Sequence, residues 1–314
     1  MSAVVDPSNA PTGKLPLWHT IRLSYATYIQ HFAAGLRIAA LWLPPIAVLA
    51  LIAGWLQATL LAELAAGPGP QIDVSQPLQL LMLGHVLNLV IACATVSSAV
   101  AWHRLLLSKE EPAWTSAGNV GTRNLWRYVG AALVICLIAA IPLAAVLAAL
   151  ALFDLLPAAG RTPPDVIAVI ALAYVVSVAL MLRLSLLLPA RATGNPSLSL
   201  KDAWRHTHGN LWRLFFGIVA CTVPPVVLFK IIFIGLTVVP VGSGIYLAQW
   251  AVAGAISLCC WLLVWPIWVG FLSHAYRYLV RTASRRLIRS GSVHPSVRYC
   301  HRPCAGSHSS GRPS

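Results

Sequence analysis

His85 and Asn88 are the residues whose types and spacing best suit chemistry within an apolar environment. They are three residues apart in the apolar run 78–102, so a helix would place them on one face. An imidazole and a carboxamide on one face can line a polar path or bind a headgroup, and polar residues inside a membrane are functional candidates by default. The same pair can instead form interhelical hydrogen bonds of about 1 kcal/mol each. We favour this structural interpretation and leave the functional one open.

Lys230 is the costliest charged residue in any apolar run. It lies in the run 212–239, towards the predicted outer end, where its long stem would let the ammonium group reach the interface. His85, Asn88 and Lys230 are therefore the candidate ligand or polar-path residues.

The residue types and spacings of the sequence give little support for a catalytic or metal-binding site. The chain has eight Asp and Glu residues in all, and no two share a helix at the spacing that a buried carboxylate pair in a reactive pocket would need. Cys300 and Cys304, with His294, His301 and His308, are metal-ligating types, but their spacing fits no familiar zinc module. We therefore predict a protein that is not an enzyme, with no cofactor and no metal site.

Long apolar helices are the elements that must position these residues. The chain is 58% hydrophobic and 10% charged, whereas soluble domains carry roughly 25% charged residues, and its mean hydropathy is +0.77. A bilayer core needs about 20 apolar residues per helix, and the runs are too long and too continuous for barrel strands. The prediction is an all-α integral membrane protein with six transmembrane helices, near residues 38–62, 78–102, 128–153, 166–190, 212–239 and 245–272.

Charge is distributed unevenly between the two sides of these spans. The net charge is +14, and nearly all Lys and Arg fall on one side, with Arg161 and Lys230 as the exceptions. Because positive residues stay cytoplasmic, we predict a bacterial inner-membrane protein with both termini inside. The same confinement of charge argues against nucleic-acid binding. The chain then divides into an N-terminal amphipathic segment (1–37), a membrane domain (38–289) and a basic tail (290–314) whose composition is typical of disorder.

The word NLWR occurs twice, at 124–127 and 210–213, each time just before a long apolar run. Asn is a good N-cap, Trp prefers the membrane interface and Arg reaches lipid phosphates. We favour this structural interpretation over a catalytic one, and the recurrence suggests three degenerate helical hairpins with cytoplasmic amphipathic helices. The predicted inner-interface lipid contacts are Trp126, Arg127, Trp204, Arg205, Trp212 and Arg213.

Two amphipathic helices are predicted on the inner side. Ser199 and Asp202 have the spacing of a capping box, Gly209 can end that short helix, and Asn210 can start the next. Residues 17–36 also repeat apolar side chains every three or four positions. Each helix either lies in the headgroup region or packs on the bundle as a brace, and both alternatives are open.

The run from Arg183 to Phe216 resembles a family of polytopic prokaryotic membrane proteins. These are the membrane domains found beside glycerophosphoryl diester phosphodiesterases, together with related uncharacterised six-span inner-membrane proteins. The resemblance implies membrane residence; the phosphodiesterase activity, where present, belongs to a separate soluble domain for which this chain has no room. The residues that carry it are Ser199, Ala203, Trp204, Thr207, Gly209, Asn210, Trp212, Arg213 and Phe215.

These observations lead to one expected function and one alternative. We expect a non-enzymatic protein of envelope or lipid organisation, or an accessory to a membrane-protein partner, in contact with anionic headgroups at the cytoplasmic face. The alternative is a small-solute or lipid transporter, because transporters use interrupted helices at binding sites. The interrupting prolines are Pro44, Pro45, Pro142, Pro224, Pro225 and Pro266.

Overall fold

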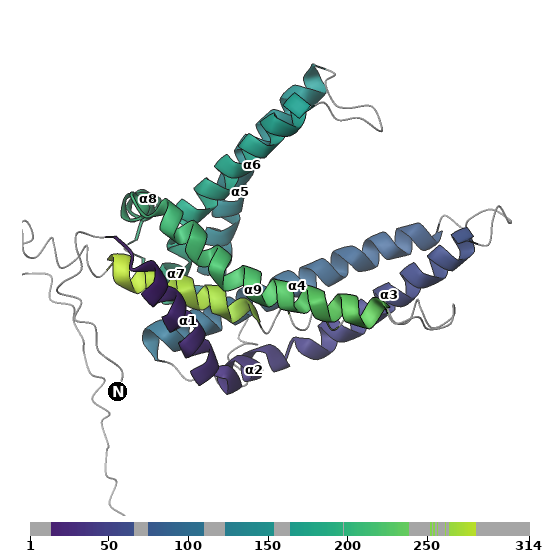
Figure 1. Ribbon diagram of the computed structural model, residues 1–314, viewed down its shortest axis with the longest axis horizontal. Coiled ribbons are helices and arrows are strands. Elements are labelled where there is room, and N and C mark those ends of the chain that lie inside the picture. Colours follow the sequence, from purple (N-terminus) through teal and green to yellow (C-terminus); the bar gives the residue numbers. More distant parts are fainter. Residues whose placement is uncertain are drawn as a thin grey trace, which may run out of the picture.

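The computed structural model describes residues 14–65, 75–109, 123–153, 164–196, 198–238 and 264–280, together with Val252, Gly254, Ile256 and Trp261. Within these ranges every regular element is a helix, which confirms the expected all-α fold (Figure 1). Residues 264–280 are helical and are called the C-terminal helix below. The others are α1 (Leu17–Gln30), α2 (Phe32–Ala40), α3 (Leu43–Ala65), α4 (Ser75–Ser108), α5 (Arg123–Leu152), α6 (Pro164–Leu184), α7 (Leu187–Ala192), α8 (Leu200–Thr207) and α9 (Leu211–Val238).

Four stretches of the described chain are long and apolar enough to cross a membrane, and a fifth is added if α2 and α3 count as one bent span. They coincide with the first five predicted spans. The sixth, 245–272, falls mostly outside the described residues, as do the external loops and the tail 290–314. The outward faces are apolar: Leu137 is 68% exposed, Leu172 64% and Ile141 63%. Such a surface suits lipid rather than water. The four stretches are Leu78–Ser108, Arg123–Leu152, Pro164–Ala192 and Leu211–Ile231.

The first predicted span is broken near its start: α2 ends at Ala40 and α3 begins at Leu43. Residues 38–40 belong to α2, and the two helices meet at a bend of 59°. Pro44 and Pro45 explain the break, because neither has an N–H to continue the hydrogen-bond ladder from α2. Both prolines instead occupy the first turn of α3, where the amides would have no intrahelical partner anyway.

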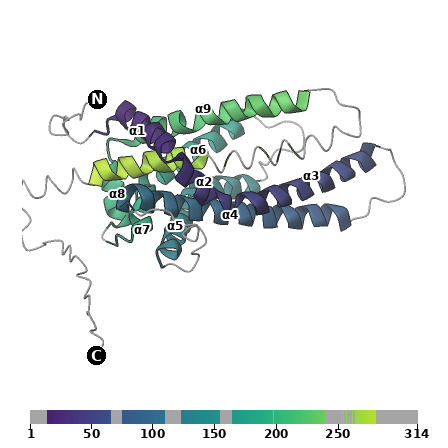
Figure 2. The same ribbon diagram turned by 90° about the horizontal axis from the view of Figure 1, so that it is seen from below.

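The helices form hairpins that extend from a shared base. α3 pairs with α4, and α5 pairs with α6. The two pairs leave the base in different directions in Figure 1, and Figure 2 shows α1, α7, α8 and the C-terminal helix gathered at the opposite end from the hairpin tips. The densest core lies at this base, where Leu15, Leu186, Leu214 and Phe271 are fully buried.

The short helix α8 has the predicted capping box. The Asp202 N–H donates to Ser199 Oγ at 3.2 Å, while the Ser199 N–H and hydroxyl both donate to Asp202 Oδ2. These hydrogen bonds from Ser199 lower the pKa of the Asp202 carboxyl. Gly209 has a φ of +77°, a left-handed conformation that separates α8 from α9 as predicted. Ala203 and Thr207 are buried against the bundle, which supports the brace alternative for this helix.

The N-terminal amphipathic segment also packs as a brace. Instead of running unbroken from 17 to 36, it is interrupted at His31 between α1 and α2. Ile21, Ser24 and Thr27 of α1 are buried, and the Tyr25 hydroxyl donates to the Ala220 carbonyl of α9 at 2.9 Å. Ala220 precedes Pro224 by four residues, so its carbonyl is the one that proline leaves without a helical N–H donor. Tyr25 thus supplies from α1 the hydrogen bond that Pro224 cannot make.

Tyr25→Phe should therefore destabilise the protein by about 1–3 kcal/mol, since it leaves a carbonyl in an apolar setting without this donor. The measurement is the thermal midpoint of the detergent-purified protein. In a Pro224→Ala background, where the helix regains its own N–H donor, the same substitution should cost clearly less. Equal losses in both backgrounds would show that the tyrosine acts through packing alone.

Candidate functional site

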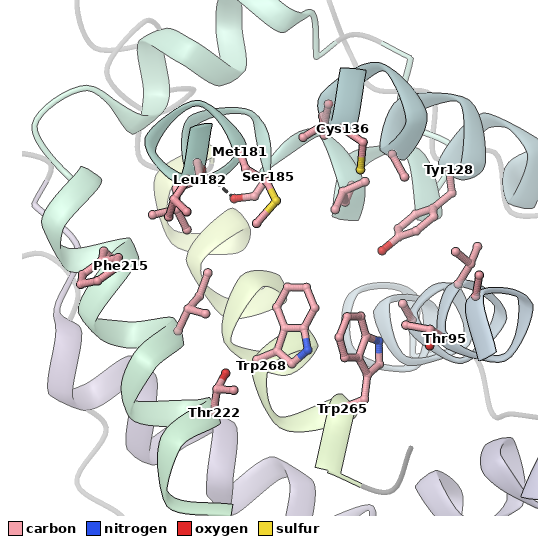
Figure 3. Close-up of a pocket in the computed structure, with 18 of the residues that line it drawn as sticks. Thr95, Tyr128, Cys136, Met181, Leu182, Ser185, Phe215, Thr222, Trp265 and Trp268 are labelled. Carbon is pink, nitrogen blue, oxygen red and sulfur yellow. Dashed lines mark hydrogen bonds between the residues drawn. The ribbon is translucent and has the colours of Figure 1, made fainter. Parts of the chain in front are cut away.

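An apolar cavity of about 610 Å³ lies among the transmembrane helices. It lies where α4, α5, α6, α9 and the C-terminal helix come together (Figure 3). Its volume is within the usual range of small-molecule sites, roughly 300–1,000 Å³. The lining residues include Ala92, Thr95, Val96, Ala99, Tyr128, Ala132, Ile135, Cys136, Tyr174, Val178, Met181, Leu182, Ser185, Leu188, Phe215, Ile218, Val219, Thr222, Trp261, Trp265 and Trp268.

Three tryptophans form one wall of this cavity. Trp265 and Trp268 are three residues apart on one face of the C-terminal helix, and the Trp261 and Trp265 ring centroids are 5.6 Å apart. The Trp265 and Trp268 rings meet edge to face with centroids 4.3 Å apart. Trp265 Nε1 is buried and has no hydrogen-bond acceptor within the described part of the chain. A buried indole N–H normally finds an acceptor.

Two hydroxyl groups of the lining donate to backbone carbonyls three or four residues earlier. Ser185 Oγ donates to Leu182 O at 2.8 Å, and Thr95 Oγ1 donates to Ile91 O at 2.6 Å. Among the described residues that line the cavity there is no Asp, Glu, His, Lys or Arg. The described lining therefore offers a bound molecule mainly apolar surface.

His85 and Asn88 lie elsewhere on α4. Both are exposed, and the His85 Nδ1–H donates to the Leu81 carbonyl one turn earlier at 2.7 Å. α4 faces the cavity through Ala92, Thr95, Val96 and Ala99 instead. Lys230 is also exposed, on α9 beyond the stretch that lines the cavity. The structure therefore does not bring these three candidates to the cavity, and their role as a polar path stays a prediction.

The predicted interface residues divide into outward-facing and inward-bonded groups. Trp126 is 61% exposed, Trp212 68% and Trp204 42%, and Arg205 is exposed too. Such positions leave the indoles accessible to lipid. Two arginines contact protein: the Arg183 guanidinium lies 4.2 Å above the Trp204 ring, and Arg213 Nη1 donates to the Leu15 carbonyl at 2.6 Å. Arg127 is half-buried.

The Asn residue in each copy of the NLWR sequence contacts a segment that is distant along the chain. Asn210 is buried, and its Oδ1 accepts the Leu15 N–H at 2.8 Å. With Arg213 on the Leu15 carbonyl, the second copy therefore holds both backbone groups of one residue. In the first copy, the Asn124 amide lies beside Gly194 (φ +73°), so closely that a Cβ there would be 3.2 Å from the amide.

The sequence analysis missed the aromatic wall, although one signal was present. Trp261, Trp265 and Trp268 fall within the word WLLVWPIWV, whose four- and three-residue spacing predicts a continuous aromatic face on a helix. Tyr128, immediately after the first NLWR, also lines the cavity. What no local pattern shows is which other helices face that wall.

Searches for similar proteins complete the description of the site. The expected resemblance to membrane domains found beside glycerophosphoryl diester phosphodiesterases, carried by residues 199–215, stays a prediction. No protein-family model, no curated protein and no solved structure matches this chain.

Proposed function

We propose that this chain is a non-enzymatic, six-span protein of a bacterial inner membrane that binds the acyl chain of a membrane lipid in the cavity behind Trp265 and Trp268. In this proposal its three hairpins place the helical base on the cytoplasmic side, and the protein acts in lipid organisation. The resemblance of the 199–215 segment to the family of membrane domains described above is consistent with this role.

The cavity is the observation that carries the proposal. It is bounded by helices long enough to cross a bilayer, so the molecules around it are lipids. Its described lining is apolar and uncharged, which matches an acyl chain and disfavours a charged solute.

Two further functions share part of this support. Transport of a lipid is favoured by the bend between α2 and α3, because interrupted helices accompany alternating access. The prolines inside α5 and α9, expected as interruptions, lie in continuous helices. An accessory role is compatible with the exposed indoles of Trp126 and Trp212. Flux of a fluorescent lipid in vesicles identifies a transporter, whereas co-purification of a stoichiometric membrane protein identifies an accessory.

Filling the cavity tests lipid binding directly. Ala132 lines the cavity from α5, and Ala132→Phe should weaken lipid retention at least about tenfold, since excluding two methylenes forfeits about 0.8 kcal/mol each. The measurement is native mass spectrometry of the protein in mild detergent during titration with phosphatidylcholine. Ala140→Phe is the matched control, because Ala140 is exposed on the same helix and does not line the cavity. Equal retention by both variants would exclude the cavity as the lipid site.

A further inference from the structure

A second cavity lies at the helical base and differs sharply in character from the first. Its volume is about 670 Å³, and it is bounded by α1, α2, the end of α4 and the C-terminal helix. The described residues that line it are Leu23, Thr27, Gln30, His31, Ala33, Ala34, Arg37, Leu105, Leu106, Lys109, His274 and Arg277.

Three cationic side chains from distant parts of the chain meet in this basic cavity. Arg37 comes from α2, Lys109 directly follows α4, and Arg277 comes from the C-terminal helix. No Asp or Glu is among the described residues of its lining. Like charges repel one another. An anion bound in the cavity would offset this repulsion and be attracted by all three cations.

The arginine of the C-terminal helix is held in place. Its Nη2 donates to the Leu106 carbonyl in the last turn of α4, where the helix leaves carbonyls without intrahelical donors. Lys109 follows that turn with a φ of +58°, which is unusual for a residue other than glycine. The end of α4 thus contributes a lysine to the cavity lining and holds Arg277 through the Leu106 carbonyl.

The uncharged polar groups of the lining are partly used within the protein. Thr27 Oγ1 donates to Leu23 O at 2.6 Å, so its single proton is used. His274 Nε2 lies 3.2 Å from Thr27 Oγ1. Because the Thr27 proton is used, His274 must be the donor in that contact. The Gln30 amide also lines the cavity and is exposed. Gln30 is therefore an uncharged donor that lines the cavity with the three cations, and a tetrahedral oxyanion, which prefers arginine forks, matches these groups.

We propose that the basic cavity binds a phosphate group, namely that of an anionic phospholipid headgroup at the membrane surface. Arg37 lies just before the first span, and Lys109 and Arg277 lie just after the ends of apolar runs, which is the depth of lipid phosphates. The cavity shares with the proposed function only the location in a membrane. It is a separate site from the apolar cavity, and no residue lines both.

The test compares lipids and variants of the full chain in mild detergent. Native mass spectrometry is used to titrate phosphatidylglycerol and, separately, zwitterionic phosphatidylcholine. The wild-type protein should retain phosphatidylglycerol preferentially. Arg37→Gln with Lys109→Gln should weaken that retention about 25-fold, because each basic residue near an anionic surface contributes a factor of about five. Both side chains are exposed, so folding should be preserved.

Matched controls separate this site from general charge and from the apolar cavity. Arg22→Gln with Lys201→Gln removes the same charge from exposed positions outside the cavity and should leave the preference intact, as should Ala132→Phe. Competition with inorganic phosphate identifies the source: no displacement at millimolar concentration supports a lipid headgroup, and full displacement shows that the site takes soluble phosphate instead. Equal phosphatidylglycerol retention by wild type and Arg37→Gln/Lys109→Gln would overturn the site.

Discussion

Gly217→Ala should destabilise the protein by roughly 1–3 kcal/mol, the usual cost of overpacking a core. A Cβ at this position in α9 would lie 2.0 Å from Cζ and 2.4 Å from Cε2 of Phe271. The Phe271 ring is fully buried in the core of the base, so it cannot move aside without displacing its neighbours. The measurement is the thermal midpoint in detergent.

Gly217→Ala is expected to destabilise the protein, which is the opposite of the usual effect of this substitution in a helix. Glycine in a helix interior is normally the worse residue, by about 0.5–1 kcal/mol relative to alanine. Gly130 of α5 is the matched control, because a Cβ there would meet nothing within 4 Å, and Gly130→Ala should stabilise or be neutral. Adding Phe271→Leu to Gly217→Ala should recover part of the loss. If both alanine variants behave alike, the close approach of α9 and the C-terminal helix is wrong.

Features of the fold that depend only on neighbours in the chain could be predicted from the sequence. A run of about 20 apolar residues is a property of one segment, and α5, α6 and α9 accordingly lie close to their predicted bounds. The capping box of Ser199 and Asp202 joins residues three apart, so a pattern of four letters suffices to find it.

Helix boundaries were harder to predict where hydropathy and proline favour different positions. Hydropathy favours a helix from residue 38 onward, and Pro44 and Pro45 favour a new start. The prolines prevail in the structure, and α3 begins at Leu43. In α9 the outcome is the opposite: Pro224 and Pro225 lie inside a continuous helix, because Tyr25 from another part of the chain supplies a hydrogen bond to Ala220.

The two cavities could not be predicted, because each depends on which helices become neighbours. The apolar cavity joins Tyr128 to tryptophans more than a hundred residues later, and the basic cavity joins Arg37 to Arg277. His85 and Asn88 were predicted as candidate site residues because they are polar residues within an apolar span. Both are exposed on α4. Spacing along one helix shows which residues share a face, but only packing shows what that face meets.

The repeated word NLWR leads to the second large effect. Asn210→Ala should cost about 1–3 kcal/mol, because the N–H of Leu15 would lose its acceptor inside the core. Leu15 is completely buried and Asn210 is 3% exposed, so water cannot replace the lost amide. Asn124→Ala in the first copy should cost less, since Asn124 is only half-buried. Thermal midpoints of the two variants give the comparison.

A serine at the same position separates the two roles of this asparagine. Serine caps helices about as well as asparagine, but its hydroxyl is one bond closer to the backbone and falls short of the Leu15 N–H that Asn210 Oδ1 reaches at 2.8 Å. If Asn210 mainly holds the N-terminal segment, Asn210→Ser should be as unstable as Asn210→Ala, and cleavage next to Lys14 by a protease should accelerate equally in both. Recovery of stability in Asn210→Ser would instead assign the residue to capping α9. The first result would mean that the two copies of NLWR, alike in sequence, stabilise the bundle through different long-range contacts.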